Sequence, residues 1–99
     1  MARLPADHRR QQILLTACEI ASHGRLYTFT LEDVAERVGI TIPGVKYYFY
    51  SVTGLRADVI AKAKEVGHLE VLRQAIAAYD PLVDNLDVSL RNAAIESLR

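Results

Sequence analysis

Hydroxyl, aromatic and cationic side chains occur together in a short stretch near the middle of the chain. The stretch contains Thr41, Lys46 and the adjacent tyrosines Tyr47 and Tyr48. Threonine and tyrosine hydroxyls donate hydrogen bonds to phosphate oxygens, and a lysine ammonium group supplies a positive charge beside them. The chemistry that these residue types favour is binding to a nucleic-acid backbone, without a covalent step.

Three further residues fit the same chemistry. Ile42 can contact the methyl group of thymine, and Gly44 permits a close approach of the backbone to the bases. Thr30 opens an earlier helix, where its hydroxyl and the first N–H groups can bind a phosphate. The residues predicted to contact DNA are Thr30, Thr41, Ile42, Gly44, Lys46, Tyr47 and Tyr48.

Residues suited to catalysis or metal binding are sparse. Cys18 is the single cysteine, which excludes an internal disulfide and leaves no Cys/His cluster for zinc. The sequence also has no Ser/His/Asp arrangement, no Gly-rich phosphate loop and no paired carboxylates with a pocket to serve. We therefore expect neither an enzyme nor a protein that holds a metal or a cofactor.

Apolar residues recur at three- and four-residue spacing along the chain, which predicts helices and therefore an all-α fold. Gly24 and Gly39 mark helix ends, since glycine accepts the left-handed conformation there. Asp80-Pro81 marks another end. Helices are expected over about 7–23, 30–38, 41–49 and 54–66, with the fourth pattern resuming past Gly67 as far as 79, and over 82–99.

The helices over 30–38 and 41–49 are separated by a turn of about three residues. Thr30 and Asp33 match a capping box, and Ala35 lies where the two helices must approach closely. Such a pair is typical of a helix-turn-helix, whose second helix lies in the major groove. The sequence predicts a three-helix helix-turn-helix domain over 1–66, followed by one or two further helices in a C-terminal extension over 67–99.

Residues 30–55 contain a motif whose residues stand at defined spacings. It comprises Thr30-Leu31, Val34-Ala35, Val38-Gly39-Ile40-Thr41, Tyr47-Tyr48-Phe49, Ser51 and Leu55. On these positions the segment 13–55 resembles the N-terminal DNA-binding domain of the TetR family of transcriptional repressors. The resemblance implies a homeodomain-like arrangement of three helices and sequence-specific binding to DNA.

The chain departs from the family pattern at two positions and in length. Lys46 stands where the family usually has tyrosine, and Val52 where it has lysine; both family residues commonly contact phosphate. About 33 residues follow Val66, too few for an enclosed ligand cavity of ~300 Å³ or more. A small-molecule effector is not expected within these residues. The chain is either a natural minimal regulator or the truncated N-terminal part of a ligand-responsive repressor.

Opposite charges are balanced, with 12 Lys and Arg against 12 Asp and Glu. This argues mildly against a nucleic-acid binder, since such domains are usually basic. Residues 1–66 nevertheless carry nine basic and seven acidic side chains, and residues 67–99 carry three and five. No apolar run approaches the ~20 residues that span a bilayer, so no membrane is expected. A lone cysteine fits a cytoplasmic protein.

Two classes of function remain open. We expect a sequence-specific transcriptional regulator, a repressor that binds a palindromic operator in double-stranded DNA as a homodimer. The alternative is a protein-interaction adaptor or antirepressor that keeps the fold and binds DNA weakly. Apolar residues step by four along the last predicted helix, at 82, 86, 90, 94 and 98. They can pack on their own monomer or form a two-fold interface, and we expect the interface because a monomer reads few base pairs.

Overall fold

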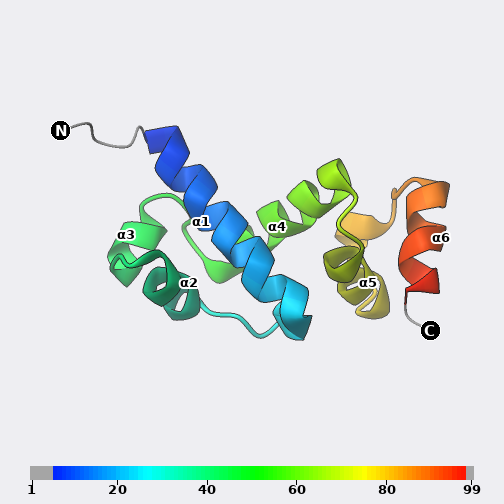
Figure 1. Ribbon diagram of the computed structural model, residues 1–99, viewed down its shortest axis with the longest axis horizontal. Coiled ribbons are helices and arrows are strands. Elements are labelled where there is room, and N and C mark those ends of the chain that lie inside the picture. The colour runs from blue at the N-terminus through cyan, green and yellow to red at the C-terminus, as the bar shows by residue number, and fades with distance from the viewer. Residues whose placement is uncertain (1–5, 98–99) are drawn as a thin grey trace.

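The computed structural model describes residues 6–97, which fold into helices joined by short connections, with no strand in that range (Figure 1). The expected all-α class is confirmed. The α-helices are α1 (Ala6–Ile20), α2 (Leu31–Val38), α3 (Ile42–Lys46), α4 (Val52–Val66), α5 (Leu69–Ala77) and α6 (Val88–Glu96). A π-helical turn, η1 (Ala21–Arg25), follows α1, and a 3-10 turn, η2 (Pro81–Val83), precedes α6.

The first helix ends close to the predicted place but not in the predicted form. Its last turn widens into η1, and the backbone leaves the helical conformation at His23 and Gly24, where Gly24 has φ +80°. Gln74 of α5 holds this turn from the side. Its Nε2 donates to the carbonyl oxygen of Ala21 at 2.7 Å, and its Oε1 accepts the N–H of Leu26 at 2.9 Å.

The second and third helices begin where their capping residues predict. The hydroxyl of Thr30 accepts the N–H of Asp33 while the Asp33 carboxylate accepts the N–H of Thr30, so the capping box is present. Thr41 caps α3 in a similar way. The third helix is shorter than predicted, because it ends at Lys46. Beyond it, Tyr47 and Phe49 still donate their N–H groups to the carbonyl oxygens of Pro43 and Val45, at 3.0 and 2.9 Å, so the chain continues in turn conformation.

The core is built from apolar residues of all six α-helices, joined by Phe29, Val83 and Leu86 from the segments between them. No polar or charged residue is buried among the residues that the structure describes. The largest side chains that are fully buried there are Phe29, Ile13, Leu26, Leu55, Ile60, Leu72, Val34, Val45, Val59 and Val71. Because this core is purely apolar, its stability comes from the area removed from water, at about 25 cal/mol per Å².

The C-terminal third differs most from the prediction. Gly67 adopts φ +71° and ends α4, so α5 is a separate helix, and two α-helices, α5 and α6, lie in the described part of the predicted extension. The predicted helix from Leu82 is wrong. Asp80 caps the short turn η2, the chain then leaves helical conformation, and α6 begins only at Val88, after its N-cap Asp87.

The apolar stripe predicted on that last helix therefore does not exist as one face. Leu86 and Ala94 are buried, Leu82 is exposed and Leu90 is half-buried. The fifth member, Leu98, lies outside the described residues.

The molecule is elongated, with extents of 46 × 24 × 20 Å. Figure 1 shows α2 and α3 at one end and α5 and α6 at the other, with α1 and α4 between them. Helix α5 packs against α4 and η1, whereas α6 packs chiefly against α5. This arrangement leaves the surface around α3 free of the C-terminal helices.

Candidate functional site

Helices α2 and α3 pack against each other at one end of the molecule, joined by residues 39–41 (Figure 1). Gly39 has φ +87°, and its N–H donates to the carbonyl oxygen of Ala35 at 2.8 Å. Ile40 donates to the same oxygen at 3.0 Å. Ala35 and Val45 are buried, so the small side chain of Ala35 permits the close crossing that the sequence predicted.

Both threonines of the candidate site serve first as helix caps. The Thr30 hydroxyl oxygen accepts the N–H of Asp33 at 3.0 Å, and the Thr41 hydroxyl oxygen accepts the N–H of Gly44 at 3.1 Å. Both residues are exposed. Because a hydroxyl carries one donor beside its acceptor lone pairs, Thr41 keeps an O–H that can donate to a ligand, whereas the Thr30 hydroxyl also hydrogen-bonds the Asp33 carboxylate.

The two apolar members of the predicted site differ in their surroundings. Ile42 is 37% exposed at the first position of α3. Gly44 is half-buried, and a Cβ there would lie 3.3 Å from the Thr41 hydroxyl oxygen and 3.5 Å from Cδ1 of Ile40. A side chain at position 44 would therefore crowd the cap of α3, which gives this glycine a packing role inside the protein.

Lys46 has no hydrogen-bond or ion-pair partner among residues 6–97. Every other lysine or arginine between residues 6 and 97 makes a hydrogen bond or ion pair with another side chain or a backbone carbonyl. Lys46 is exposed at the last position of α3 and makes none of these contacts. Lys46 is thus the one lysine or arginine in the described part of the chain whose charged group has all its donors available to an external anion.

The two predicted tyrosines have unequal access to solvent. Tyr47 is 81% exposed, whereas Tyr48 is half-buried and packs against the core. Their rings meet edge to face, with centroids 5.0 Å apart and an interplanar angle of 82°. Phe49, the next aromatic residue, is buried as its spacing from Val45 predicts. The ring of Tyr48 therefore supports that of Tyr47 from the protein side.

Sequence reasoning assigned no role to Tyr50, yet this residue is 91% exposed. Val52, where the resemblance implies a lysine, is half-buried and packs against the core. The signal that marks Tyr50 is its place between an inward-facing Phe49 and the N-cap Ser51.

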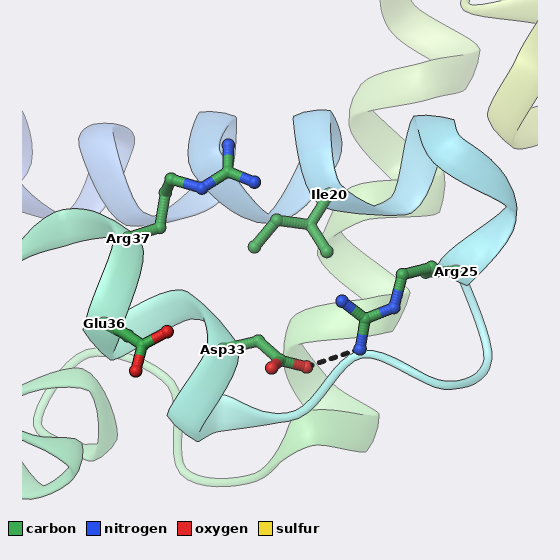
Figure 2. A pocket seen from close by; sticks show the side chains of 5 residues that line it. All are labelled: Ile20, Arg25, Asp33, Glu36 and Arg37. Carbon is green, nitrogen blue, oxygen red and sulfur yellow. Dashed lines mark hydrogen bonds and ion pairs between the residues drawn. The ribbon is translucent and has the colours of Figure 1, made fainter.

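An open hollow lies beside this region, between the end of α1 and η1 on one side and α2 on the other (Figure 2). Its volume is about 340 Å³ and its lining consists of Ile20, Arg25, Asp33, Glu36 and Arg37. Arg25 reaches across it to Asp33, with Nη2 2.7 Å from Oδ2, as Figure 2 shows. Arg37 pairs with Glu19 of α1 at 2.7 Å. These two ion pairs tie α2 to α1 and η1 and engage both arginines.

The electrostatics at the start of α2 favour an ionised Asp33. The hydrogen bond from the Thr30 N–H, with those from the Thr30 hydroxyl and Arg25, holds the pKa of its carboxyl below the ordinary 3.8, against a smaller opposing effect of desolvation. Glu32 and Glu36 are exposed on the same helix. Negative charge therefore gathers on α2, and the free positive charge lies on α3.

The connector that leads into α2 is held by α4 and by the turn after α5. Arg56 of α4 donates from Nε to the Leu26 carbonyl oxygen at 2.9 Å, and its guanidinium lies 5.3 Å from the Tyr27 ring centroid. The Tyr27 hydroxyl donates to Asp80 at 2.8 Å. Burial and this hydrogen bond raise the pKa of the Tyr27 phenol. With the contacts of Gln74, these bonds fix the chain just before the α2 cap.

Two further features of the described residues concern metal ions and membranes. Between residues 6 and 97, no group of three His, Cys, Asp or Glu side chains is placed to hold a metal ion. Cys18 is half-buried, and burial raises the pKa of its thiol. No helix within that range combines the length and apolar character needed to cross a membrane.

No family model, no curated protein and no solved structure matches this chain. The inference of function therefore rests on the chemistry of the residues around α3.

Proposed function

We propose that this chain is a cytoplasmic, sequence-specific DNA-binding transcriptional regulator in which α2 and α3 act as a helix-turn-helix. In this role α3 enters the major groove of double-stranded DNA and α2 crosses the phosphate backbone. The observation that carries the proposal is the free ammonium group of Lys46 between the exposed residues Thr41 and Tyr47. A cation and two hydroxyl donors on one short segment match the contacts that phosphate oxygens accept.

The placement of the segment supports the same role. Ile42 at the first turn of α3 is exposed and can contact a thymine methyl group. The C-terminal helices lie at the opposite end of the molecule (Figure 1), so they leave a path for a duplex along α3. The resemblance to the TetR family, carried by residues 13–55, implies the same orientation of the second helix.

A homodimer on a palindromic operator, acting as a repressor, completes the proposal. One α3 of five residues reaches few base pairs, and two copies related by a two-fold axis read two half-sites. Exposed apolar side chains on the C-terminal helices, Val66 of α4 with Val88 and Ile95 of α6, are suited to a two-fold contact.

Selection of bound sequences from a pool of random duplexes tests the function. We expect one enriched motif, arranged as two half-sites about one helical turn (~34–36 Å) apart or multiples of it. Folded protein should bind that duplex at least ~10³-fold more tightly than a scrambled one. A folded chain that enriches no sequence and binds every duplex equally would contradict the proposal.

A protein-interaction adaptor is the second candidate, and the pairing of charges favours it. Nine of the ten lysines and arginines between residues 6 and 97 are engaged inside the protein. Tyr47 and Tyr50 remain exposed, and tyrosine is enriched at protein interfaces. An adaptor would show at most weak binding to any duplex that falls to nothing near physiological salt, with no motif enriched.

A further inference from the structure

The backbone around Tyr50 is held on both sides. Phe49 donates its N–H to the Val45 carbonyl oxygen at 2.9 Å, and its buried ring lies 4.6 Å from the guanidinium carbon of Arg10. Ser51 caps α4, with its hydroxyl oxygen accepting the N–H of Gly54 at 3.1 Å. The residue between them therefore starts from a fixed position, although it lies outside any helix.

The Tyr50 side chain makes no contact that explains its presence within the protein. It is 91% exposed, and it forms neither a hydrogen bond nor a ring contact with the described residues. Burial of its ring therefore contributes little to folding, since apolar stabilisation follows the area removed from water. A large ring on a fixed backbone presents its hydroxyl to an external partner at a small entropic cost, because it has only two rotatable side-chain bonds.

The position of Tyr50 relative to Lys46 suits a DNA backbone. Tyr50 lies four positions after Lys46, so their Cα atoms lie no more than about 14 Å apart. This limit is similar to the width of the major groove, about 12 Å, so both side chains can reach the backbone of one duplex. Val52, which follows, packs its apolar side chain against the core and offers no polar group.

We propose that the Tyr50 hydroxyl donates a hydrogen bond to a DNA phosphate next to the one that Lys46 contacts. This inference rests on the DNA-binding function proposed above. The contact is neutral on the protein side, so it adds affinity without adding a released counterion. As a backbone contact it fixes the register of α3 on the duplex and carries no direct sequence information.

Tyr50→Phe tests the proposal, because it removes the hydroxyl and keeps the ring. Tyr79→Phe is the matched control, since Tyr79 is 90% exposed in the turn after α5, at the far end of the molecule from α3. Affinity for the selected duplex and for a scrambled one is measured by fluorescence anisotropy at several salt concentrations. We expect Tyr50→Phe to weaken binding to both duplexes by at least about fivefold, with an unchanged salt slope, and Tyr79→Phe to bind as the unaltered chain does.

Each other result overturns the proposal in a recognisable way. If the unaltered chain binds the duplex and Tyr50→Phe binds equally well, the hydroxyl makes no contact and the proposed function stands. If only Tyr50→Ala weakens binding, the ring acts by packing rather than by donation. An equal loss in Tyr79→Phe would show that the effect is not local. If the folded, unaltered chain, checked by circular dichroism, binds no duplex, both the inference and the proposed function are wrong.

Discussion

Replacing Lys46 with alanine should almost remove the salt dependence of DNA binding. Each phosphate neutralised by a cation contributes about −0.9 to the slope of log K against log salt. Lys46 is the one unengaged cation between residues 6 and 97, so a dimer would make about two such contacts and show a slope near −1.8. Affinity would then fall only about tenfold between 50 and 200 mM salt, far less than for a protein with six to ten contacts.

Anisotropy titrations of the selected duplex over that salt range measure the slope for each variant. We expect the slope of Lys46→Ala to lie near zero. Lys64→Ala is the control, because it also removes one positive charge but from the last turn of α4, away from α3. Lys64 donates there to the Leu82 carbonyl oxygen. An unchanged slope in Lys46→Ala would refute the assignment of this residue. A slope steeper than about −5 in the unaltered chain would show that arginines now paired within the protein turn to the phosphates.

Three further changes probe the fold and the assembly. Gln74→Ala removes the bonds to Ala21 and Leu26 and should lower the free energy of unfolding by about 1–3 kcal/mol. Gln11→Ala, an exposed control on α1, should change the urea midpoint little. Equal urea midpoints for Gln74→Ala and the unaltered chain would contradict the role of Gln74. The lowered pKa of Asp33 stabilises the fold above the ordinary value of 3.8, and this contribution is lost as the pH falls through the lower, folded-state pKa. Asp33→Asn should therefore lower the urea midpoint at neutral pH, and the difference in midpoint from the unaltered chain should become smaller in acid. A difference in midpoint that is independent of pH would argue against a stabilising role of the Asp33 carboxylate. Val88→Asp should yield monomers in sedimentation, with Val88→Ala still dimeric, and a chain already monomeric at micromolar concentration would exclude the proposed two-fold contact.

The beginnings of α2 and α3 could be predicted because their signals are local, and α4 begins two residues before its predicted start. Thr30 with Asp33, Thr41 and Ser51 each satisfy N–H groups within three residues of themselves, so no knowledge of distant contacts is needed. Gly39 ends α2 for a similar reason, since its φ of +87° disfavours any residue with a Cβ. The all-α class follows from these signals together with the apolar spacing.

The C-terminal third could not be predicted in the same way. Apolar residues four apart fit a helix over 82–99. This spacing does not take into account polar side chains that hydrogen-bond the backbone N–H groups and so compete with the helix. Asp80 accepts the N–H of Leu82, and Asp87 accepts the N–H groups of Ser89 and Leu90. These two carboxylates divide the segment into η2 and α6, and Leu86 enters the core from the stretch between them.

The residue types of the candidate site can be read from the sequence, but the solvent exposure of each residue can be predicted only in part. Hydroxyl, cationic and aromatic types are visible in the sequence, and so is the inward direction of Phe49. The consecutive aromatics at 47–50 have no period, so burial depends on how the turn after α3 meets the core. That turn buries part of Tyr48 and leaves Tyr47 and Tyr50 in solvent. Whether these residues contact DNA stays a prediction.

The attachment of α6 has a consequence for how the molecule opens. Its chief neighbour is α5, and Ala94 is its one fully buried residue. Detaching such a helix exposes little apolar surface, so it costs much less than global unfolding. Amide protons of α6 will exchange with solvent through this local opening, whereas those of α1 and α4 will exchange only through global unfolding. In denaturant, α6 at the end opposite α3 is therefore expected to open before the core formed by α1 and α4.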